Sequence, residues 1–232
     1  MDHVIVTEKS HVHYTVSRKK MKNMRIRVKG DGCVAVSAPF CVSENHIKDF
    51  VFQNAAFIVQ RQQHIEAQRQ RSYPASYENG DSFLFLGRRI GLKVERAENQ
   101  SAVNIENLLV LRVPEHMDAK QVFSKWMARM ARSVFAERIA KAAPLFGEKG
   151  ISLSVRSMLT RWGSINTRRR RMSLTVHLLR CEMELIDYVI VHELCHLQNA
   201  RHGRKFYSTL ERHYPNRRAL DKRLKQFGLV DF

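Results

Sequence analysis

The sequence predicts an α+β protein in which a β-rich N-terminal region with one long helix precedes a more helical domain. Two observations support this fold class. In the first forty residues, short apolar runs separated by polar residues are typical of half-buried strands. Later in the chain, apolar residues recur three and four positions apart over segments long enough for helices. We therefore divide the chain into residues 1–114 and 115–232.

The N-terminal region combines strands with the long helix. A Gly30-Asp31-Gly32 step separates the last two of the first four strands, as expected for a hairpin turn. Ser43 is a suitable N-cap for the helix, whose apolar stripe continues through Ala55 to Val59. The expected strands are 3–6, 12–16, 24–28, 33–39, a hairpin over 82–96 that turns near Gly87 to Gly91, and 107–114.

The second region contains most of the helices. Asp118 can cap a helix that ends at Pro144, and residues 160–171 read as a basic loop between two strands. The other expected elements are strands at 151–158 and 172–179 and helices at 182–200, 203–213 and 216–227.

Charge is the unusual global feature of the chain. Forty lysine and arginine residues against 22 aspartate and glutamate residues give a net charge of +18. Such a surface favours anionic partners such as nucleotides or nucleic acid, although a solvated basic surface is the alternative. The four cysteines have no CxxC spacing, and neither a secretory signal nor an apolar run of about 20 residues is present. We therefore expect a cytoplasmic protein without a membrane span.

The segment His192-Glu193-Leu194-Cys195-His196 matches the HExxH pattern of zinc hydrolases. Positions four apart lie on one face of a helix, so both imidazoles can reach one Zn²⁺ ion. Glu193 is then next to the metal and can take a proton from its water as a general base. Apolar residues on the preceding turns predict a buried helix, as an active site of this kind needs.

A third zinc ligand is expected after this helix. His202 follows His192 by ten residues, the spacing at which a chain turns back to offer a further histidine. Asn199 takes the position usually held by glycine, and asparagine tolerates the left-handed conformation expected there. Glu211 and His213 on the next helix remain alternatives.

At these residues the chain resembles the YgjP-like metallopeptidase family, which is similar to SprT-like and WLM-type zinc proteins. The resemblance rests on Arg161-Trp162-Gly163-Ser164, on the strand 172–176, on 188–196, and on His202 with Phe206-Tyr207, which corresponds to an HxxxFW ending. It implies a zincin-like, zinc-dependent hydrolase over most of the chain. Ile165 stands where family members commonly carry cysteine.

Three further residues are candidates for substrate binding. Arg161 and Trp162 either pin their loop or hold a substrate carboxylate or phosphate, and His177 follows the strand before the metal helix. The run Arg168 to Arg171 can steer an anionic substrate.

The sequence favours a metallopeptidase acting on a peptide or protein, which would pair with strand Met172–Val176 as an added edge strand. The alternatives are a metal-dependent nucleotide (nucleoside triphosphate) pyrophosphohydrolase, a protease that binds nucleic acid without sequence preference, and a non-catalytic zinc-binding protein.

Overall fold

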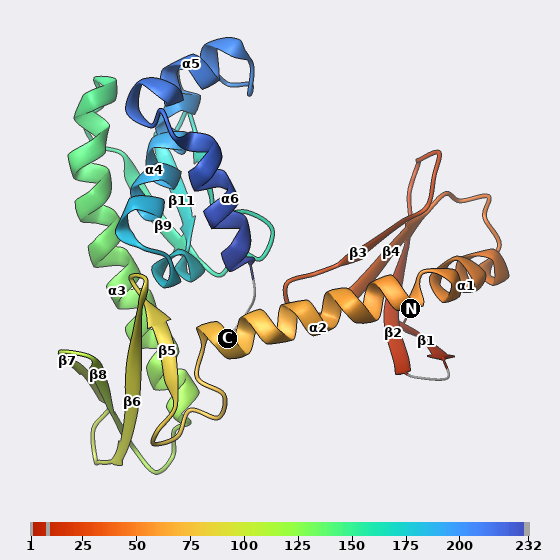
Figure 1. The fold of residues 1–232 in the computed structure, drawn as a ribbon, viewed down its shortest axis with the longest axis horizontal. Coiled ribbons are helices and arrows are strands. Elements are labelled where there is room, and N and C mark those ends of the chain that lie inside the picture. Colours follow the sequence, from red (N-terminus) through yellow and green to blue (C-terminus); the bar gives the residue numbers. More distant parts are fainter. Residues whose placement is uncertain (1, 8–9, 230–232) are drawn as a thin grey trace. The chain divides into compact units, whose positions relative to one another are not determined.

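The structure, a computed structural model, describes residues 2–7 and 10–229, and it confirms the predicted α+β class. By its internal contacts the chain forms two compact units, one extending to Arg69 and the other beginning at Gln70 (Figure 1). The first unit contains one sheet with its helices, and the second contains two.

The first unit is a four-stranded sheet covered on one face by helices. Its strand order is β1-β2-β4-β3, with β2 and β4 parallel and the other pairs antiparallel. Inward side chains of β2, β3 and β4 alternate with outward ones and pack against Ile47, Val51 and Ile58 of the helices. The elements are β1 (Asp2–Thr7), β2 (Ser10–Arg18), β3 (Arg25–Val28), β4 (Val34–Ala38), α1 (Glu44–Gln53) and α2 (Ala55–Ser72).

The predicted cap at Ser43 is confirmed, but the single helix expected after it is wrong. The amide of His46 donates to the Ser43 hydroxyl at 3.3 Å, which fixes the start of α1. The helix stops at Asn54, whose side-chain amide donates to the Phe50 carbonyl at 2.8 Å. A side chain that bonds the backbone in this way competes with the helical pattern, and α2 begins anew at Ala55.

The second unit contains two sheets and one long helix that runs beside both (Figure 1). One sheet has the order β5-β6-β8-β7, and the other has the order β10-β11-β9. The elements are β5 (Ser82–Phe85), β6 (Arg88–Arg96), β7 (Ser101–Ile105), β8 (Leu108–Val113), α3 (Ala119–Ala142), η1 (Ala143–Phe146), β9 (Ser152–Arg156), β10 (Gly163–Asn166), β11 (Arg171–Thr175), η2 (Val176–Arg180), α4 (Met183–Gln198), α5 (Arg204–His213) and α6 (Arg217–Phe227).

Helix α3 joins the two sheets and explains where the chain divides. Asp118 caps it as predicted, accepting from the Lys120 amide at 3.1 Å. Its Phe123 ring lies 4.9 Å from that of Phe83 on β5, and further along α3 packs on β9 and α4. The sheet of β5 to β8 therefore belongs with the site-bearing helices, and the structure divides at Arg69 instead of at the predicted boundary after residue 114.

The sheet beside α4 differs from the sequence prediction in one consequential respect. Strand β11 lies in the middle, antiparallel to β10 and parallel to β9, so both of its edges are already paired. It cannot accept a substrate by edge pairing, as the sequence suggested for Met172–Val176. The edge strand that packs against α4 is β10, within the segment expected to be a loop. In the described part of the chain, no helix is long and apolar enough to cross a membrane.

Candidate metal centre

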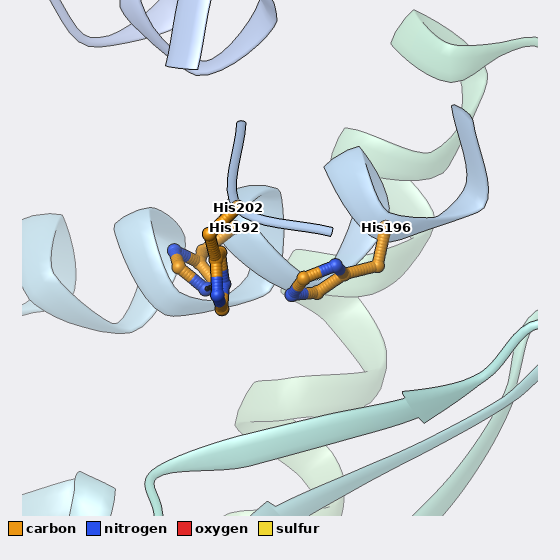
Figure 2. A group of neighbouring side chains, drawn as sticks. All are labelled: His192, His196 and His202. Atoms are coloured by element: carbon orange, nitrogen blue, oxygen red, sulfur yellow. Dashed lines mark hydrogen bonds between the residues drawn. The ribbon is translucent and has the colours of Figure 1, made fainter. Parts of the chain in front are cut away.

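Helix α4 presents two histidines on one side and buries its apolar side. Leu185, Val189 and Leu194 are buried in the second unit, as their spacing predicts. The imidazoles of His192 and His196, one helical turn apart, stand together with ring centroids 5.3 Å apart (Figure 2).

The structure adds His202 to this pair. The Nε2 atoms of His192 and His202 are 3.1 Å apart, and one ring nitrogen from each of the three histidines lies within 4.8 Å of the others. His202 comes from the segment between α4 and α5 and reaches back over the helix (Figure 2). The two alternatives are engaged elsewhere, because Glu211 pairs with Arg217 at 2.7 Å and the ring of His213 packs on Phe146.

The turn before His202 is built differently from the prediction. Asn199 has φ of −140° and ψ of 99°, so the left-handed conformation expected for it is wrong. The backbone amide of Asn199 donates to the Cys195 carbonyl at 2.9 Å. The backbone carbonyl of Asn199 lies 3.3 Å from Nδ1 of His196. A carbonyl can only accept, so this contact requires the proton on Nδ1 and leaves Nε2 of His196 able to bind a metal.

Two aromatic residues of α5 hold the three imidazoles in place. The Phe206 ring lies 4.7 to 5.0 Å from all three histidine rings. The ring of Tyr207 is stacked on that of His202, with the ring centroids 6.2 Å apart. The guanidinium of Arg217 in turn lies 4.2 Å from the centre of the Tyr207 ring. The third histidine, which lies outside any helix or strand, is thus supported by side chains of α5 and α6.

Burial favours the neutral form of the two imidazoles on α4. Burial, together with the neighbouring His196 and His202, lowers the pKa of His192 to about 4. Burial also lowers the pKa of His196. Neutral imidazole is the form that binds zinc, so this environment removes the competition from protons at neutral pH.

Glu193 lies beside the histidines but is almost enclosed. It is 7% exposed, and burial raises its pKa to about 7, with Arg161 and a hydrogen bond from the Ile165 amide acting in the opposite direction. Gly163 on β10 makes room for it: a Cβ there would lie 3.0 Å from both Cγ and Oε1 of Glu193. A carboxylate with a pKa near neutrality, beside a metal site, is poised to accept a proton.

The donor set fits zinc. Three neutral imidazoles around an open position are a common ligand set of catalytic zinc. Bonds of about 2.05 Å in tetrahedral geometry separate ligand nitrogens by about 3.3 Å, close to the 3.1 Å between His192 and His202. This pair of nitrogens already has the spacing of two zinc ligands, and the nitrogen of His196 lies within 4.8 Å of both.

The remaining residues singled out from the sequence lie in different surroundings. His177 is fully buried, with Nδ1 2.5 Å from the Tyr73 hydroxyl and Nε2 2.9 Å from the Ser157 hydroxyl. These contacts favour a structural role over contact with substrate. Trp162 faces the buried Arg180, whereas Arg161 is exposed and close enough to affect Glu193.

Arg180 is a residue that the sequence pattern did not reveal. Its guanidinium is fully buried, lies 5.1 Å from the Tyr73 ring, and donates to the His177 and Gly228 carbonyls. Its Nη1 has no hydrogen-bond partner among the described residues. An arginine next to an apolar strand gave no signal of burial, since this residue type is mostly exposed.

In the basic run Arg168 to Arg171, one of the four side chains forms an ion pair within the protein. Arg170 forms an ion pair with Glu148 at 2.7 Å, while Arg168, Arg169 and Arg171 are exposed. These three side chains extend the positive surface and do not enter the histidine cluster.

An α+β fold with three histidines gathered on and beside one helix is an arrangement used by metal-dependent peptidases. The model of the YgjP-like metallopeptidase domain matches residues 22–227, and the chain belongs to this family. The family supports a metallopeptidase and implies a metal.

Two solved structures are similar to parts of the chain. The metallopeptidase zymogen abylysin of Pyrococcus abyssi is 18% identical with a TM-score of 0.38, and covers 42% of this chain and 99% of its own. The metallopeptidase zymogen jannalysin of Methanocaldococcus jannaschii is 18% identical with a TM-score of 0.37, and covers 40% of this chain and 94% of its own. No curated protein sequence matches the chain.

Proposed function

We propose that the protein is a zinc-dependent metallopeptidase in which His192, His196 and His202 hold the metal and Glu193 is the general base. The observation that carries this proposal is the gathering of three imidazole nitrogens within 4.8 Å beside a buried carboxylate. Bound zinc would polarise the scissile carbonyl and lower the pKa of a water molecule.

Glu193 supplies the proton-accepting group of this mechanism. Its carboxylate is held at one place by the Ile165 amide on β10 and by the close approach of Gly163. Because its pKa is raised to about 7, it can take a proton from the attacking water and later give it to the leaving amine. Arg161 is exposed and close enough to act on the carboxylate, and it can hold a negatively charged substrate group.

We assign the binding of an extended peptide to β10, the edge strand beside α4. Strand β10 pairs with β11 on one side and has no strand partner on the other within the described ranges. The Ile165 amide points to Glu193, so the amides of alternate residues on β10 face away from β11. A substrate strand added there would bring its backbone next to the general base, a common mode of peptide recognition.

The function can be tested with zinc-loaded protein and two probes, fluorescein-labelled casein and ATP. We expect casein to be cleaved and ATP to remain intact. Glu193→Gln should keep its zinc and lose about 10²-fold or more in turnover, the usual scale for a positioned general base. Glu98→Gln, an equal change of charge at an exposed position between β6 and β7, is the matched control and should be fully active.

The outcomes separate the alternatives. Hydrolysis of ATP that depends on Glu193 would replace the peptidase by a nucleotide hydrolase. Zinc binding without turnover of either probe would favour a binding protein. Equal activity of Glu193→Gln and wild type would exclude the carboxylate as the base.

A further inference from the structure

A dense group of positive charges lies on and beside β3 in the first unit. Residues 18–29 contain seven lysine and arginine residues and no aspartate or glutamate. Arg18 is used within the fold, where it donates to the Pro39 and Val42 carbonyls. The other six are exposed and make no ion pair with any described residue: Lys19, Lys20, Lys22, Arg25, Arg27 and Lys29. We call them the basic face.

The strand register places two of these charges, Arg25 and Arg27, on the outer face of the sheet, and the four lysines lie in the segments that flank β3. Val34 and Val36 of β4 and Ile26 of β3 point inward to the helices, so their neighbours along each strand point outward. Across β2, β4 and β3, Ser17, Ser37 and Arg25 form one row of the outer face, and Thr15, Ala35 and Arg27 form the next, in which Asp2 of β1 is in register with Thr15. The middle of the face is therefore a floor of small side chains beside the two arginines, and the four lysines flank β3 along the chain.

We infer that this basic face binds the phosphodiester backbone of a nucleic acid. Arg25 and Arg27 are two residues apart on one strand, a separation of about 6.7 Å. This distance is close to the axial rise of two nucleotides in a duplex, about 6.8 Å. The floor of small side chains lets a backbone approach closely, while the lysine side chains can adjust to phosphates on either side.

The chemistry of the face favours nucleic acid over a membrane surface. A peripheral membrane site combines cations with apolar side chains that enter the bilayer. The outward residues described for β2, β3 and β4 include no large apolar side chain. Among the residues of this unit whose burial is described, from Val12 onward, the large exposed apolar ones are Phe40, after β4, and Phe52 and Phe57 on the helices that cover the opposite face.

This inference does not depend on the proposed peptidase activity, because none of its residues belongs to the metal centre. It assigns a partner to part of the +18 charge of the chain. Contacts confined to the phosphate backbone predict binding without sequence preference and with strong dependence on salt.

The test measures binding of the full chain to fluorescein-labelled DNA of about 30 residues, single-stranded or duplex, by fluorescence anisotropy. If all six cations contact duplex phosphates, affinity should fall about 10³-fold between roughly 50 and 200 mM salt. In the double variant Arg25→Gln/Arg27→Gln, two contacts are lost, and the fall should be only about 10²-fold over the same range.

A matched variant on the helices distinguishes a site from bulk charge. Lys48→Gln/Arg61→Gln removes the same charge from exposed positions on α1 and α2 and should bind DNA like wild type. Glu193→Gln should also bind like wild type. Circular dichroism must show that each variant is folded before binding is compared.

Three results would overturn the inference. The first is an absence of DNA binding at low salt, and the second is equal weakening by the two double variants. The third is tighter binding to phosphatidylserine vesicles than to DNA, which would make the face a membrane site.

Discussion

The buried His177 should make the stability of the second unit depend on pH, and His177→Gln should remove this dependence. The imidazole is fully buried, and its nitrogens are bonded by the hydroxyls of Tyr73 and Ser157. Burial, together with the charge of Arg180, lowers the pKa of His177 to about 3. In the unfolded chain the same imidazole is solvated, with an ordinary pKa of about 6.5.

The sign and the size of the effect follow from these two pKa values. Between pH 6.5 and about 3, the unfolded chain binds a proton at this position that the folded chain does not, so acid favours unfolding. The stabilisation is fully present above the unfolded pKa and is lost as the pH falls. Lowering the pH from about 7.5 to about 5 should reduce the free energy of unfolding by about 2 kcal/mol through this group alone.

Urea denaturation of wild type and His177→Gln at the two pH values measures this contribution. Trp126 and Trp162, the two tryptophans of the chain, both lie in the second unit, so their fluorescence reports on that unit. Chelator is present throughout, because zinc binding has its own pH dependence. Other titrating groups, including His192, are shared by both proteins and cancel when the two pH differences are subtracted.

A wild type that loses no more stability than His177→Gln between the two pH values would refute this reasoning. It would mean that the folded chain accommodates a charged imidazole at this position. If the variant does not fold, His177→Asn in the same assay keeps the prediction testable, since asparagine is also neutral and can still bond a hydroxyl.

Three further predictions concern the metal centre. His202→Ala should weaken zinc binding by more than about 100-fold, which exceeds the effect of about 10- to 100-fold expected for a residue that only supports a ligand. His213→Ala should leave zinc affinity unchanged, and competition with a chromophoric chelator measures both affinities. Tyr207→Leu should weaken zinc binding by about 10- to 100-fold through the loss of its stacking on His202, and Tyr207→Phe, which keeps the ring, should restore it. Gly163→Ala should displace the general base and reduce casein cleavage by up to about 10²-fold with zinc binding intact, while Gly203→Ala, where a Cβ meets nothing, should remain active; unchanged cleavage in Gly163→Ala would show that the carboxylate tolerates the shift.

Elements with their own strong local pattern could be predicted from the sequence. The caps at Ser43 and Asp118 and the apolar spacing of α4 depend on residues within a few positions of one another, and the structure confirms them. Strand β10 could not be found in this way. Its four residues form a strand because they pair with β11. The sequence Gly163–Asn166 has no alternation of polar and apolar residues from which a strand could be predicted.

The candidate site shows the same division between local and distant information. The helical spacing of His192 and His196 predicts their proximity, and the spacing to His202 suggested a third member that the structure brings within reach. The supports of that histidine were not predictable, because Tyr207 and Arg217 meet only when α5 and α6 have folded. The RWGS segment marked Gly163 as part of a motif. Its role of leaving room for Glu193 could not be predicted, because it depends on the packing of a strand against a helix.

The position of His202 links metal binding to the folding of the last two helices. His192 and His196 lie on a buried helix and stay near one another without help from the C-terminal segment. His202 lies in the connection to α5, where Tyr207 stacks on it and Arg217 of α6 covers Tyr207. A zinc ion that binds all three histidines would therefore stabilise the docking of α5 and α6, because it binds only the conformation in which they are docked. By the same reciprocity, substitutions that loosen α6 must weaken the affinity for zinc even though they lie outside the metal centre.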